Sequence, residues 1–370
     1  MDESELPQKV TAAKAANQLP DVIELGIALV SGYAEQGLLD TNATTETINE
    51  LDKNTFYAGP LELVKNPKGE GYAAVPIDGF VQGIWYRTDW FQEKGLPEPK
   101  TWDDIMNAAK IFNNPSQNEY GIVIGTDPEQ VYTQQVFEQF ALSNGARAFD
   151  QDGKVILNNP KMVESLDYYT NLSKYGPSGN NYWREARQYY ITGKVAMIFY
   201  STYIIDDIAG LVEEYKPTVP DLSKNTGFVP IIQGPIGNQA TYGEIYTLGI
   251  MKGAEKNASK TWIKFLLNEG YLDWVNMAPG GKIPVRKTII DEWKKHEYFT
   301  YYEAGLPENI ASGMEKIQRW GYLEGKSFPL ITQIYGKKIV PNAIGKILAG
   351  DMTPEQATEW IEAQVKALEV

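Results

Sequence analysis

Short apolar runs alternate with amphipathic segments along most of the chain. Runs of strand length lie at residues 22–25, 73–77, 83–86, 195–199 and 247–251. Between them, apolar residues recur every three or four positions, which is the spacing of one face of a helix. This alternation predicts an α/β fold in which helices pack against a sheet.

Several of the predicted helices have recognisable start signals. Thr101 is followed three residues later by an aspartate, which is the pattern of a capping box. Asn159 and Thr353 each precede a proline, a favourable residue in the first turn of a helix. One further helix is predicted from an apolar stripe alone, formed by Ala258, Trp262, Phe265 and Leu266.

Length and charge narrow the range of functions. The chain has 370 residues and a formal net charge of −14. This length exceeds that of one ordinary domain, so two lobes of roughly 150–200 residues each are expected. The negative charge argues against nucleic acid, whose phosphates require a basic surface, and against an anionic membrane surface as the main partner. We therefore predict a partner that is neither nucleic acid nor membrane.

Composition also excludes several chemistries. Cysteine is absent, which rules out disulfides, thiolate catalysis and cysteine-based zinc sites. The single histidine, His296, leaves no multi-histidine metal site and would have to serve any Ser-His-Asp arrangement alone. The segment 150–153 lacks the distant glutamate of a calcium loop, and the segment 279–282 lacks the spacing of a phosphate-binding loop. We predict no metal or nucleotide cofactor.

Aromatic and polar residues gather where the predicted strands begin or end. They are Asp78, Phe80 and Gln82 after the run at 73–77, Tyr203 after the run at 195–199, and Glu244 and Tyr246 before the run at 247–251. In open α/β sheets, the loops at strand ends are common places for ligands. A sugar presents apolar C–H faces and hydroxyl groups, so it favours flat aromatic rings beside planar polar side chains. The three clusters together favour a sugar-binding site over simple packing.

An ordered set of short motifs runs through nearly the whole chain. The motifs are Leu19-Pro-Asp21, the segments 72–76, 83–91 and 95–103, Asn144-Gly145, the segment 193–197, Gly249-Ile250, and the segment 281–286. In this order they resemble the extracellular solute-binding proteins of sugar ABC importers, of the type of maltose-binding protein. The order of the motifs is more specific than any one of them.

The resemblance implies a two-lobed periplasmic-binding-protein fold with a ligand cleft between the lobes and several hinge crossovers. Residues 1–79 and 247–300 would form one lobe, and residues 80–246 and 301–370 the other. The lobes would close over a ligand by hinge motion and present it to the permease subunits of an ABC transporter. The resemblance further implies a monomer that is periplasmic or extracellular and is not an enzyme.

The resemblance also implies roles for individual residues. Tyr203 stands where the maltose-type protein has a sugar-stacking tryptophan. Asp78, Phe80 and Gln82 match the first crossover into the cleft, although Phe80 could instead only pack the hinge. Glu244 and Tyr246 match the second crossover. Two other candidates, Gly281 and Arg286, match a loop that borders the site in the family, although Arg286 could instead pair with a carboxylate. Tyr132 and Trp183 are either ligand platforms or core residues.

The start of the chain departs from the family pattern. Members usually open with a strand, a helix and a second strand before the segment that matches Leu19-Pro-Asp21, whereas here a helix begins almost at Met1. The signal peptide and any lipid-bearing cysteine of the family are also absent from this sequence. A shortened chain, a misplaced gene start and a variant lobe each explain this difference, and a lipid anchor would have to come from residues outside this sequence.

Three functions are compared. The leading hypothesis is a binding protein for a mono- or oligosaccharide. A second hypothesis keeps the fold but replaces the sugar by a phosphorylated polyol or another small polar solute, which would require a cluster of Lys or Arg residues. A third is a glycoside hydrolase, which needs two carboxyl groups facing each other across the scissile bond. Asp78 and Glu244 are the candidates for such a pair, but no motif joins them.

Overall fold

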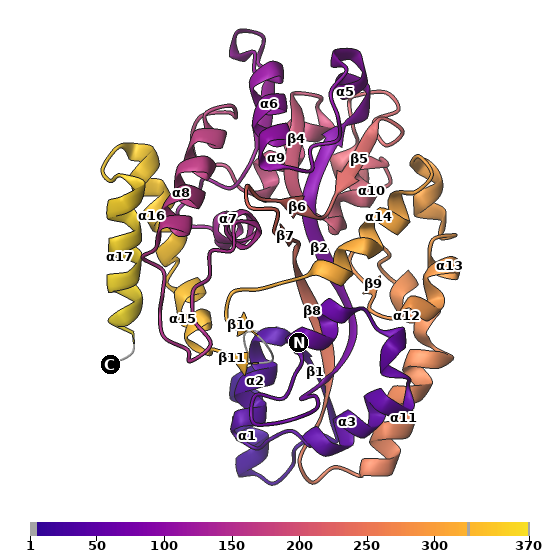
Figure 1. Cartoon of the computed structure of the whole chain (residues 1–370). Coiled ribbons are helices and arrows are strands. Elements are labelled where there is room, and N and C mark those ends of the chain that lie inside the picture. Colours follow the sequence, from indigo (N-terminus) through magenta and orange to yellow (C-terminus); the bar gives the residue numbers. More distant parts are fainter. Residues whose placement is uncertain (1–5, 324–325, 369–370) are drawn as a thin grey trace.

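The computed structural model describes residues 6–323 and 326–368 of the chain. The strands are β1 (Val22–Gly26), β2 (Val75–Arg87), β3 (Tyr120–Val123), β4 (Val195–Ser201), β5 (Thr226–Val229), β6 (Ile232–Gln233), β7 (Gln239–Ala240), β8 (Tyr242–Ile250), β9 (Ile283–Pro284), β10 (Tyr322–Leu323) and β11 (Lys326–Ser327). Helices alternate with these strands along the chain (Figure 1), so the α/β prediction is confirmed.

The helices account for most of the molecule. They are α1 (Leu6–Ala15), α2 (Ile27–Glu35), α3 (Thr41–Glu50), α4 (Ala58–Leu63), α5 (Thr88–Lys94), α6 (Trp102–Phe112), α7 (Val131–Ser143), α8 (Pro160–Ser173), α9 (Trp183–Ile191), α10 (Ile205–Ile208), α11 (Lys256–Asn268), α12 (Tyr271–Asn276), α13 (Ile290–Trp293), α14 (Leu306–Ser312), α15 (Leu330–Gly336), α16 (Ile339–Ala349) and α17 (Pro354–Lys366). Within the described part of the chain, none of them combines the length and the apolar character that a membrane crossing requires.

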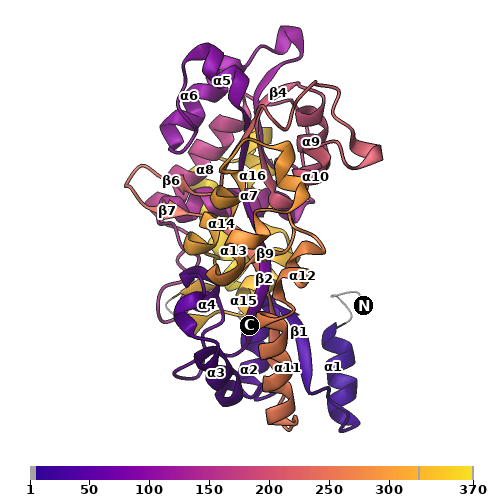
Figure 2. The same cartoon turned by 90° about the vertical axis from the view of Figure 1, so that its right-hand side faces the viewer.

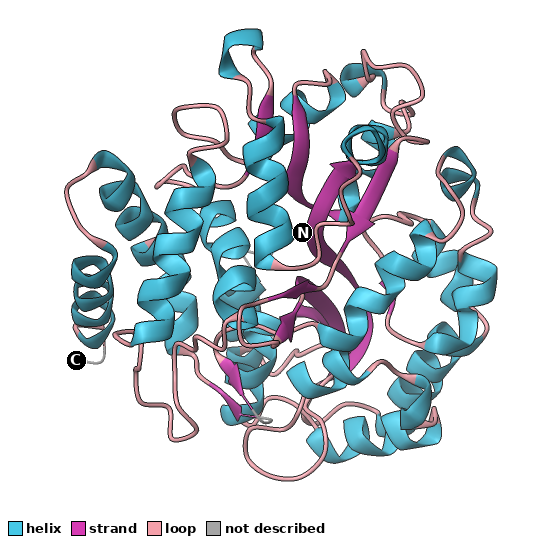
Figure 3. Cartoon of the chain, turned by 45° about the horizontal axis from the view of Figure 1, so that its top comes forward, coloured by secondary structure: helices cyan, strands magenta, loops and turns pink. Residues whose placement is uncertain are grey.

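One twisted sheet runs through the whole molecule. Its order is β1-β8-β2-β4-β3, and β5 and β9 pair with further stretches of β2. Helices lie on both sides of these strands (Figure 3). The molecule is elongated, with α5 and α6 at one end and α1, α3 and α11 at the other (Figure 2). The long strand β2 connects the two halves, because it pairs with β8 in its first part and with β4 and β5 in its second.

The strand β2 is longer than the sequence analysis predicts. We expected separate strands at 73–77 and 83–86, but the structure joins them into thirteen residues, with an irregularity between Pro76 and Asp78. The glycine between the two runs, Gly79, allows close approach of a neighbouring strand. A Cβ atom on Gly79 would lie 2.2 Å from the carbonyl oxygen of Glu244. The lobe boundaries at 79/80 and 246/247 stay predictions, and they fall inside the continuous strands β2 and β8.

The helices with strong start signals form as predicted. Thr101 and Asp104 make a reciprocal capping box at the start of α6, and Thr353 and Gln356 do the same for α17. Asn159 accepts a hydrogen bond from a backbone N–H in the first turn of α8. Such caps satisfy N–H groups that have no partner within the helix, which is why they mark helix starts reliably.

Most of the apolar stripe predicted for α11 does not face the core, and of its four residues Leu266 alone packs against a core cluster. Trp262 is 49% exposed and Phe265 is 58% exposed. The buried side of the helix is formed instead by Ser259, Lys260, Ile263 and Leu267. The stripe was therefore correct evidence for a helix but wrong evidence for the face that packs.

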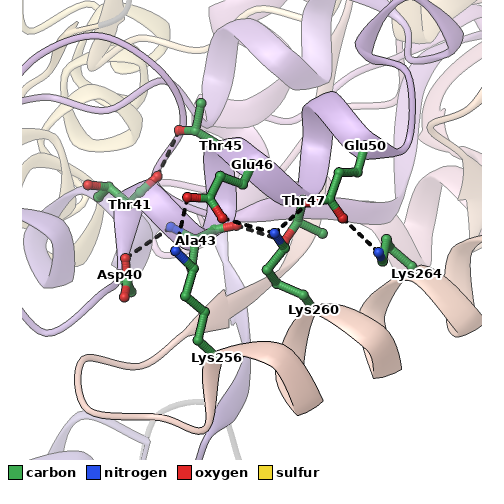
Figure 4. A network of polar contacts seen from close by, with 10 residues as sticks. All are labelled: Asp40, Thr41, Ala43, Thr45, Glu46, Thr47, Glu50, Lys256, Lys260 and Lys264. Carbon is green, nitrogen blue, oxygen red and sulfur yellow. Dashed lines mark hydrogen bonds and ion pairs between the residues drawn. The ribbon is translucent and has the colours of Figure 1, made fainter.

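Ion pairs between α11 and α3 accompany this orientation (Figure 4). The Lys260 ammonium lies 2.9 Å from a carboxylate oxygen of Glu46 and 2.5 Å from one of Glu50. Lys256 binds the same Glu46, and Lys264 binds the same Glu50. The two acidic residues are one helical turn apart on α3, so they match lysines spaced four residues apart on α11.

Candidate functional site

A cavity of about 270 Å³ lies beside the point where β2 passes from one half of the molecule to the other. It is lined by Phe80, Gln82, Tyr132, Gln135, Trp183, Tyr200, Ser201 and Tyr203. Aromatic rings predominate in this wall. None of the described residues that line it is Asp, Glu, Lys or Arg.

The sheet register brings several of these residues together. Phe80 and Gln82 are two residues apart on β2, so their side chains lie on the same face of the sheet. Gln82 is directly opposite Ser201 in the antiparallel pairing of β2 with β4. The chain then leaves β4 through the short 3₁₀ helix η4 (Thr202–Ile204), which carries Tyr203 back toward Phe80.

Two pairs of rings shape the cavity. The rings of Phe80 and Tyr203 meet edge to face, with centroids 5.5 Å apart and planes inclined by 62°. Trp183 and Tyr200 form a second edge-to-face pair at 6.5 Å. Tyr203 is 46% exposed, so part of its ring surface is open to a ligand. Partly open rings of this kind can act as flat platforms for the C–H face of a sugar.

Tyr132 is more firmly built into the wall. It lies on α7 and is buried, and its hydroxyl group donates a hydrogen bond to the carbonyl oxygen of Phe199. Burial raises the pKa of the Tyr132 hydroxyl well above its usual range, so the group is neutral. The ring lines the cavity, and the hydroxyl is bonded to the sheet. Tyr132 is therefore a core residue whose ring also forms part of the cavity wall.

Gln82 offers an unused hydrogen-bond donor. Its side chain is only 2% exposed, and its Nε2 atom has no acceptor among the described residues. A buried amide without a partner is costly, and such groups normally find one. Because Gln82 lines the cavity, a ligand oxygen could supply the missing acceptor.

Charged groups lie behind the aromatic wall. The guanidinium of Arg187 lies 5.2 Å from the centre of the Trp183 ring and 3.3 Å from a carboxylate oxygen of Asp207. Burial, together with the neighbouring carboxylate of Asp206, raises the pKa of Asp207 to about 6. Arg187 is therefore engaged with the protein and does not line the cavity.

Asp78 does not reach the cavity, contrary to its predicted role. It is fully buried, and its Oδ2 atom accepts a hydrogen bond from Trp274 Nε1 at 2.6 Å and lies 3.1 Å from Lys282 Nζ. Burial raises the pKa of this carboxyl group, although the Lys282 ammonium opposes the shift. The structure thus places Asp78 in a brace between β2 and the segment that follows α12.

The residues of the predicted second crossover, Glu244 and Tyr246, also make contacts within the protein. One carboxylate oxygen of Glu244 lies 2.5 Å from Nη1 of Arg319, and the other accepts the backbone N–H of Ile27 at 3.3 Å. Tyr246 is opposite Asp78 in the pairing of β2 with β8. Neither Glu244 nor Tyr246 lines the cavity, so their assignment as ligand contacts has no support in this arrangement.

Arg286 and Gly281 are also not among the residues that line the cavity. The buried Arg286 guanidinium donates hydrogen bonds to the backbone carbonyl of Leu51 at the end of α3 and to that of Leu267 in α11. It therefore links these two helices rather than facing the cavity. It bonds to carbonyl groups rather than to the carboxylate considered above. Gly281 contacts the ring of Tyr203 and does not itself line the cavity.

The structure thus brings five of the ten predicted site residues to one cavity: Phe80, Gln82, Tyr132, Trp183 and Tyr203. Three lining residues, Gln135, Tyr200 and Ser201, were not among the predicted site residues. Gln135 is three residues after Tyr132 on α7, so the helical period could have indicated it. Tyr200 and Ser201 belong to the strand end that was already singled out for Tyr203.

A larger groove of about 780 Å³ lies on the outer surface between α6 and α8. Its lining includes Asp103, Asp167 and Lys110, and its largest ring, Trp102, is almost completely buried. Two partly exposed rings, Tyr168 and Tyr175, also line it, so this groove combines rings with charged edges, whereas the smaller cavity has no charged residue in its described lining. In addition, no three His, Cys, Asp or Glu side chains within 6–323 and 326–368 converge on a position that could hold a metal ion.

Two α/β halves joined by continuous strands, with an aromatic cavity at the crossing, define the class of two-lobed periplasmic binding proteins. The family model described as bacterial extracellular solute-binding protein matches residues 2–272, which is well over half of the chain. The chain belongs to this family.

Curated relatives agree with this assignment. The chain is 31% identical over 356 residues to the putative ABC transporter periplasmic-binding protein YcjN of Escherichia coli strain K12, which covers 95% of this chain and 80% of the relative. It is also 31% identical over 212 residues to the mannitol-binding protein of Pseudomonas aeruginosa, covering 55% of this chain and 47% of that protein. ABC transporter solute-binding proteins are therefore its relatives in sequence.

Solved structures share the fold at lower identity. An ABC transporter solute-binding protein from Agrobacterium radiobacter K84 in complex with ribitol has a TM-score of 0.74 at 23% identity, covering 100% of this chain and 90% of that one. The maltose-bound MalE3 of T. maritima has a TM-score of 0.72 at 22% identity, covering 99% and 89%. The two-lobed fold predicted from the sequence is thereby confirmed.

Proposed function

We propose that the protein captures a neutral, hydroxyl-rich small molecule in the cavity and delivers it to the permease of an ABC importer. The ligand is a mono- or oligosaccharide or a sugar alcohol. The observation that carries this proposal is the composition of the cavity wall, which combines open aromatic rings with amide and hydroxyl groups and contains no charged side chain among its described residues.

The wall matches both surfaces of a sugar. The rings of Phe80, Trp183 and Tyr203 can pack against C–H faces, and Gln82 and Ser201 can exchange hydrogen bonds with hydroxyl groups. Ligand pockets are commonly about 300–1,000 Å³. A cavity of about 270 Å³ is slightly below this range, which favours a short saccharide or a sugar alcohol.

The names of the relatives support the same ligand class. One relative is named for mannitol and another for arabino-oligosaccharides, and two structural neighbours contain ribitol and maltose. These compounds share neutral hydroxyl-rich surfaces and differ in size. They therefore support a chemical class for this protein and do not select one compound.

The two alternatives have less support from the cavity. A phosphorylated polyol would require cationic groups, yet no Lys or Arg is among the described lining residues, and Arg187 is paired with Asp207. A glycoside hydrolase would require two facing carboxyl groups. Asp78 is fully buried and Glu244 is paired with Arg319, so neither is placed for that chemistry. We propose binding without catalysis, by a monomer that works outside the cytoplasmic membrane.

A thermal-shift panel tests the proposal directly. Mannitol, ribitol, tagatose, maltose and arabino-oligosaccharides would be added separately, with phosphorylated sugar alcohols as a charged comparison. A neutral ligand at about 100 times its Kd should stabilise the folded protein by about 2.7 kcal/mol and raise the melting temperature. The shift should be lost in a Trp183→Ala/Tyr203→Ala variant.

Three results would contradict the proposal. They are the absence of a shift with every neutral compound, a larger shift with the phosphorylated compounds, and the appearance of hydrolysis products after incubation. Size-exclusion chromatography with light scattering would test the monomer separately.

A further inference from the structure

The ring of Tyr203 lies against the backbone of Gly281, where a side chain would not fit. A Cβ atom built on Gly281 would lie 2.0 Å from Cε1 and 2.3 Å from Cζ of this ring. Real Cβ atoms essentially never approach another heavy atom within 3.0 Å. The ring would therefore have to move by about 1 Å or more to accommodate even an alanine.

The preceding residue, Gly280, makes a second contact of the same kind. A Cβ atom there would lie 2.5 Å from the carbonyl oxygen of Thr202 and 2.8 Å from Cγ1 of Ile205. The diglycine turn (Gly280–Gly281) therefore lies flush against Thr202 and Tyr203 of η4 and against Ile205 of α10, and both glycines are needed for this approach. Neither glycine has a positive φ, so the requirement is one of space and not of backbone conformation.

The diglycine turn is fixed relative to β2 by the residues that follow it. Lys282 lies 3.1 Å from the carboxylate of Asp78 and 4.0 Å from the centre of the Trp274 ring. The next residue, Ile283, belongs to β9 and pairs with Gly79 of β2. The buried carboxylate of Asp78 thus holds the turn in register with the strand that carries Phe80 and Gln82.

Tyr203 is consequently held from two sides. Phe80 lies against it edge to face at 5.5 Å, and Gly281 lies against the Cε1–Cζ edge of the ring. Both aromatic residues line the cavity, whereas Gly281 does not. Any displacement of the ring away from Gly281 changes the shape of the cavity wall without changing its chemistry.

We propose that Gly281 is a positioning residue that sets the location of the Tyr203 ring and thereby the size of ligand that the cavity accepts. Asp78 supports this role by anchoring the diglycine turn through Lys282. The inference rests on the proposed binding function, but the contact between Gly281 and Tyr203 can be tested without any ligand.

The ligand-free test is a double-mutant cycle with Gly281→Ala and Tyr203→Ala, measured by thermal unfolding. We expect Gly281→Ala to lower the melting temperature by about 2–4 °C when Tyr203 is present, because the new methyl group is overpacked. In the Tyr203→Ala background the same change should have little effect, because the ring is gone. Gly32→Ala and Gly336→Ala are matched controls, since a Cβ atom at either position meets nothing within 4 Å.

The binding test uses whichever compound of the neutral panel gives the largest thermal shift, measured by isothermal titration calorimetry. Gly281→Ala should weaken binding by about tenfold, which corresponds to about 1.4 kcal/mol, and Gly32→Ala should leave it unchanged. The loss should be greater for maltose than for ribitol if the displaced ring narrows the cavity. In the Tyr203→Ala background, Gly281→Ala should cause no further loss.

Two outcomes would overturn the inference. One is an equal loss of melting temperature in both backgrounds, and the other is unchanged affinity in Gly281→Ala. If no compound of the panel binds the unmodified protein, the proposed function fails, and the unfolding cycle still decides whether Gly281 positions Tyr203.

Discussion

The cavity wall and the buried charges near it use their side chains in opposite ways. The wall is aromatic, and at Gln82 it has a buried polar atom without a partner among the described residues. Nearby, Arg319, Glu138 and Glu244 form a charged cluster whose members bind one another and the backbone. The first region has an unpaired amide beside a cavity. In the second region the carboxylates are paired with Arg319, whose Nε atom has no hydrogen-bond partner among the described residues.

The charged cluster connects parts that are distant in the chain. Arg319 lies 2.5 Å from Glu244 on β8 and 3.7 Å from Glu138 on α7. Glu138 is fully buried and accepts a hydrogen bond from the backbone N–H of Trp320 at 2.6 Å and another from the hydroxyl of Tyr335. Burial raises the pKa of Glu138, while the Arg319 guanidinium lowers it.

The contrast shows that charge near a cleft is poor evidence for a ligand contact. Moving a charged group out of water is costly, so such groups are retained where other parts of the protein pair with them. Rings and amides can line a cavity without this requirement. In this molecule Asp78, Glu244 and Arg286 therefore stabilise the frame, and Phe80, Trp183 and Tyr203 are the better candidates for recognition.

The largest expected effect is on stability, at Arg319. Arg319→Met leaves the buried carboxylate of Glu138 and the partly buried carboxylate of Glu244 without their cation, so the free energy of unfolding should fall by about 3–5 kcal/mol. Urea denaturation followed by circular dichroism measures this. Lys295→Met is a control, because its pair with Glu292 is exposed. A similar loss in both variants would show that the buried cluster has no special importance.

The second largest expected effect is on ligand affinity, at Trp183 in the cavity wall. Trp183→Ala should weaken the binding of a ligand found in the panel by about 2 kcal/mol, roughly thirtyfold, because it removes an aromatic platform. Trp262→Ala removes a half-exposed tryptophan on α11 and should leave affinity unchanged. Calorimetric titration of both variants measures this. A greater loss of affinity in Trp262→Ala than in Trp183→Ala would contradict the comparison.

A smaller effect concerns pH and the charges behind the wall. Asp207 has a folded-state pKa of about 6, above the ordinary value of 3.8, because burial and Asp206 disfavour its charged form. Its contribution to stability is therefore full below about pH 4 and is lost as the pH rises through about 6. The asparagine of the Asp207→Asn variant does not titrate. The melting temperature of this variant minus that of the unmodified protein should therefore increase between pH 4 and pH 7. A difference that stays constant over this range would contradict the assignment.

The smallest expected effect is at the ion pairs of Figure 4, in which the buried Lys260 meets partly exposed carboxylates. Lys260→Met removes the cation that Glu46 and Glu50 share, so the melting temperature should fall slightly at low salt. The fall should shrink in 1 M NaCl, where the screening length is about 3 Å. Lys264→Met, which removes a contact with Glu50 alone, should have a smaller effect. An effect independent of salt would indicate lost packing instead.

The secondary structure was predictable where its cause is local. The caps at Thr101, Asn159 and Thr353 satisfy backbone groups within a few residues, so the sequence alone contains the signal. The packed face of α11 depends on α3, which lies about two hundred residues earlier. An apolar stripe cannot reveal that Lys260 will be buried between two glutamates while Trp262 is exposed.

The candidate site was predictable to the same extent. Phe80 and Gln82 were selected as strand-end residues, but they lie inside the continuous strand β2. The pairing of Gln82 with Ser201, the last residue of β4, places them beside Tyr203 at one cavity. The charged residues could not be assigned, because their partners are remote. Arg319 is 75 residues from Glu244. Local sequence therefore predicted where a cavity forms but not which polar groups remain available in it.

The continuous strand β2 has a consequence for how the molecule unfolds. Its thirteen residues pair with β8 in one half and with β4 and β5 in the other. Neither half therefore contains a complete sheet of its own. Loss of order in one half would remove hydrogen-bond partners from the other. Calorimetric heating should accordingly give a single endotherm whose van't Hoff and calorimetric enthalpies agree, rather than two separate transitions.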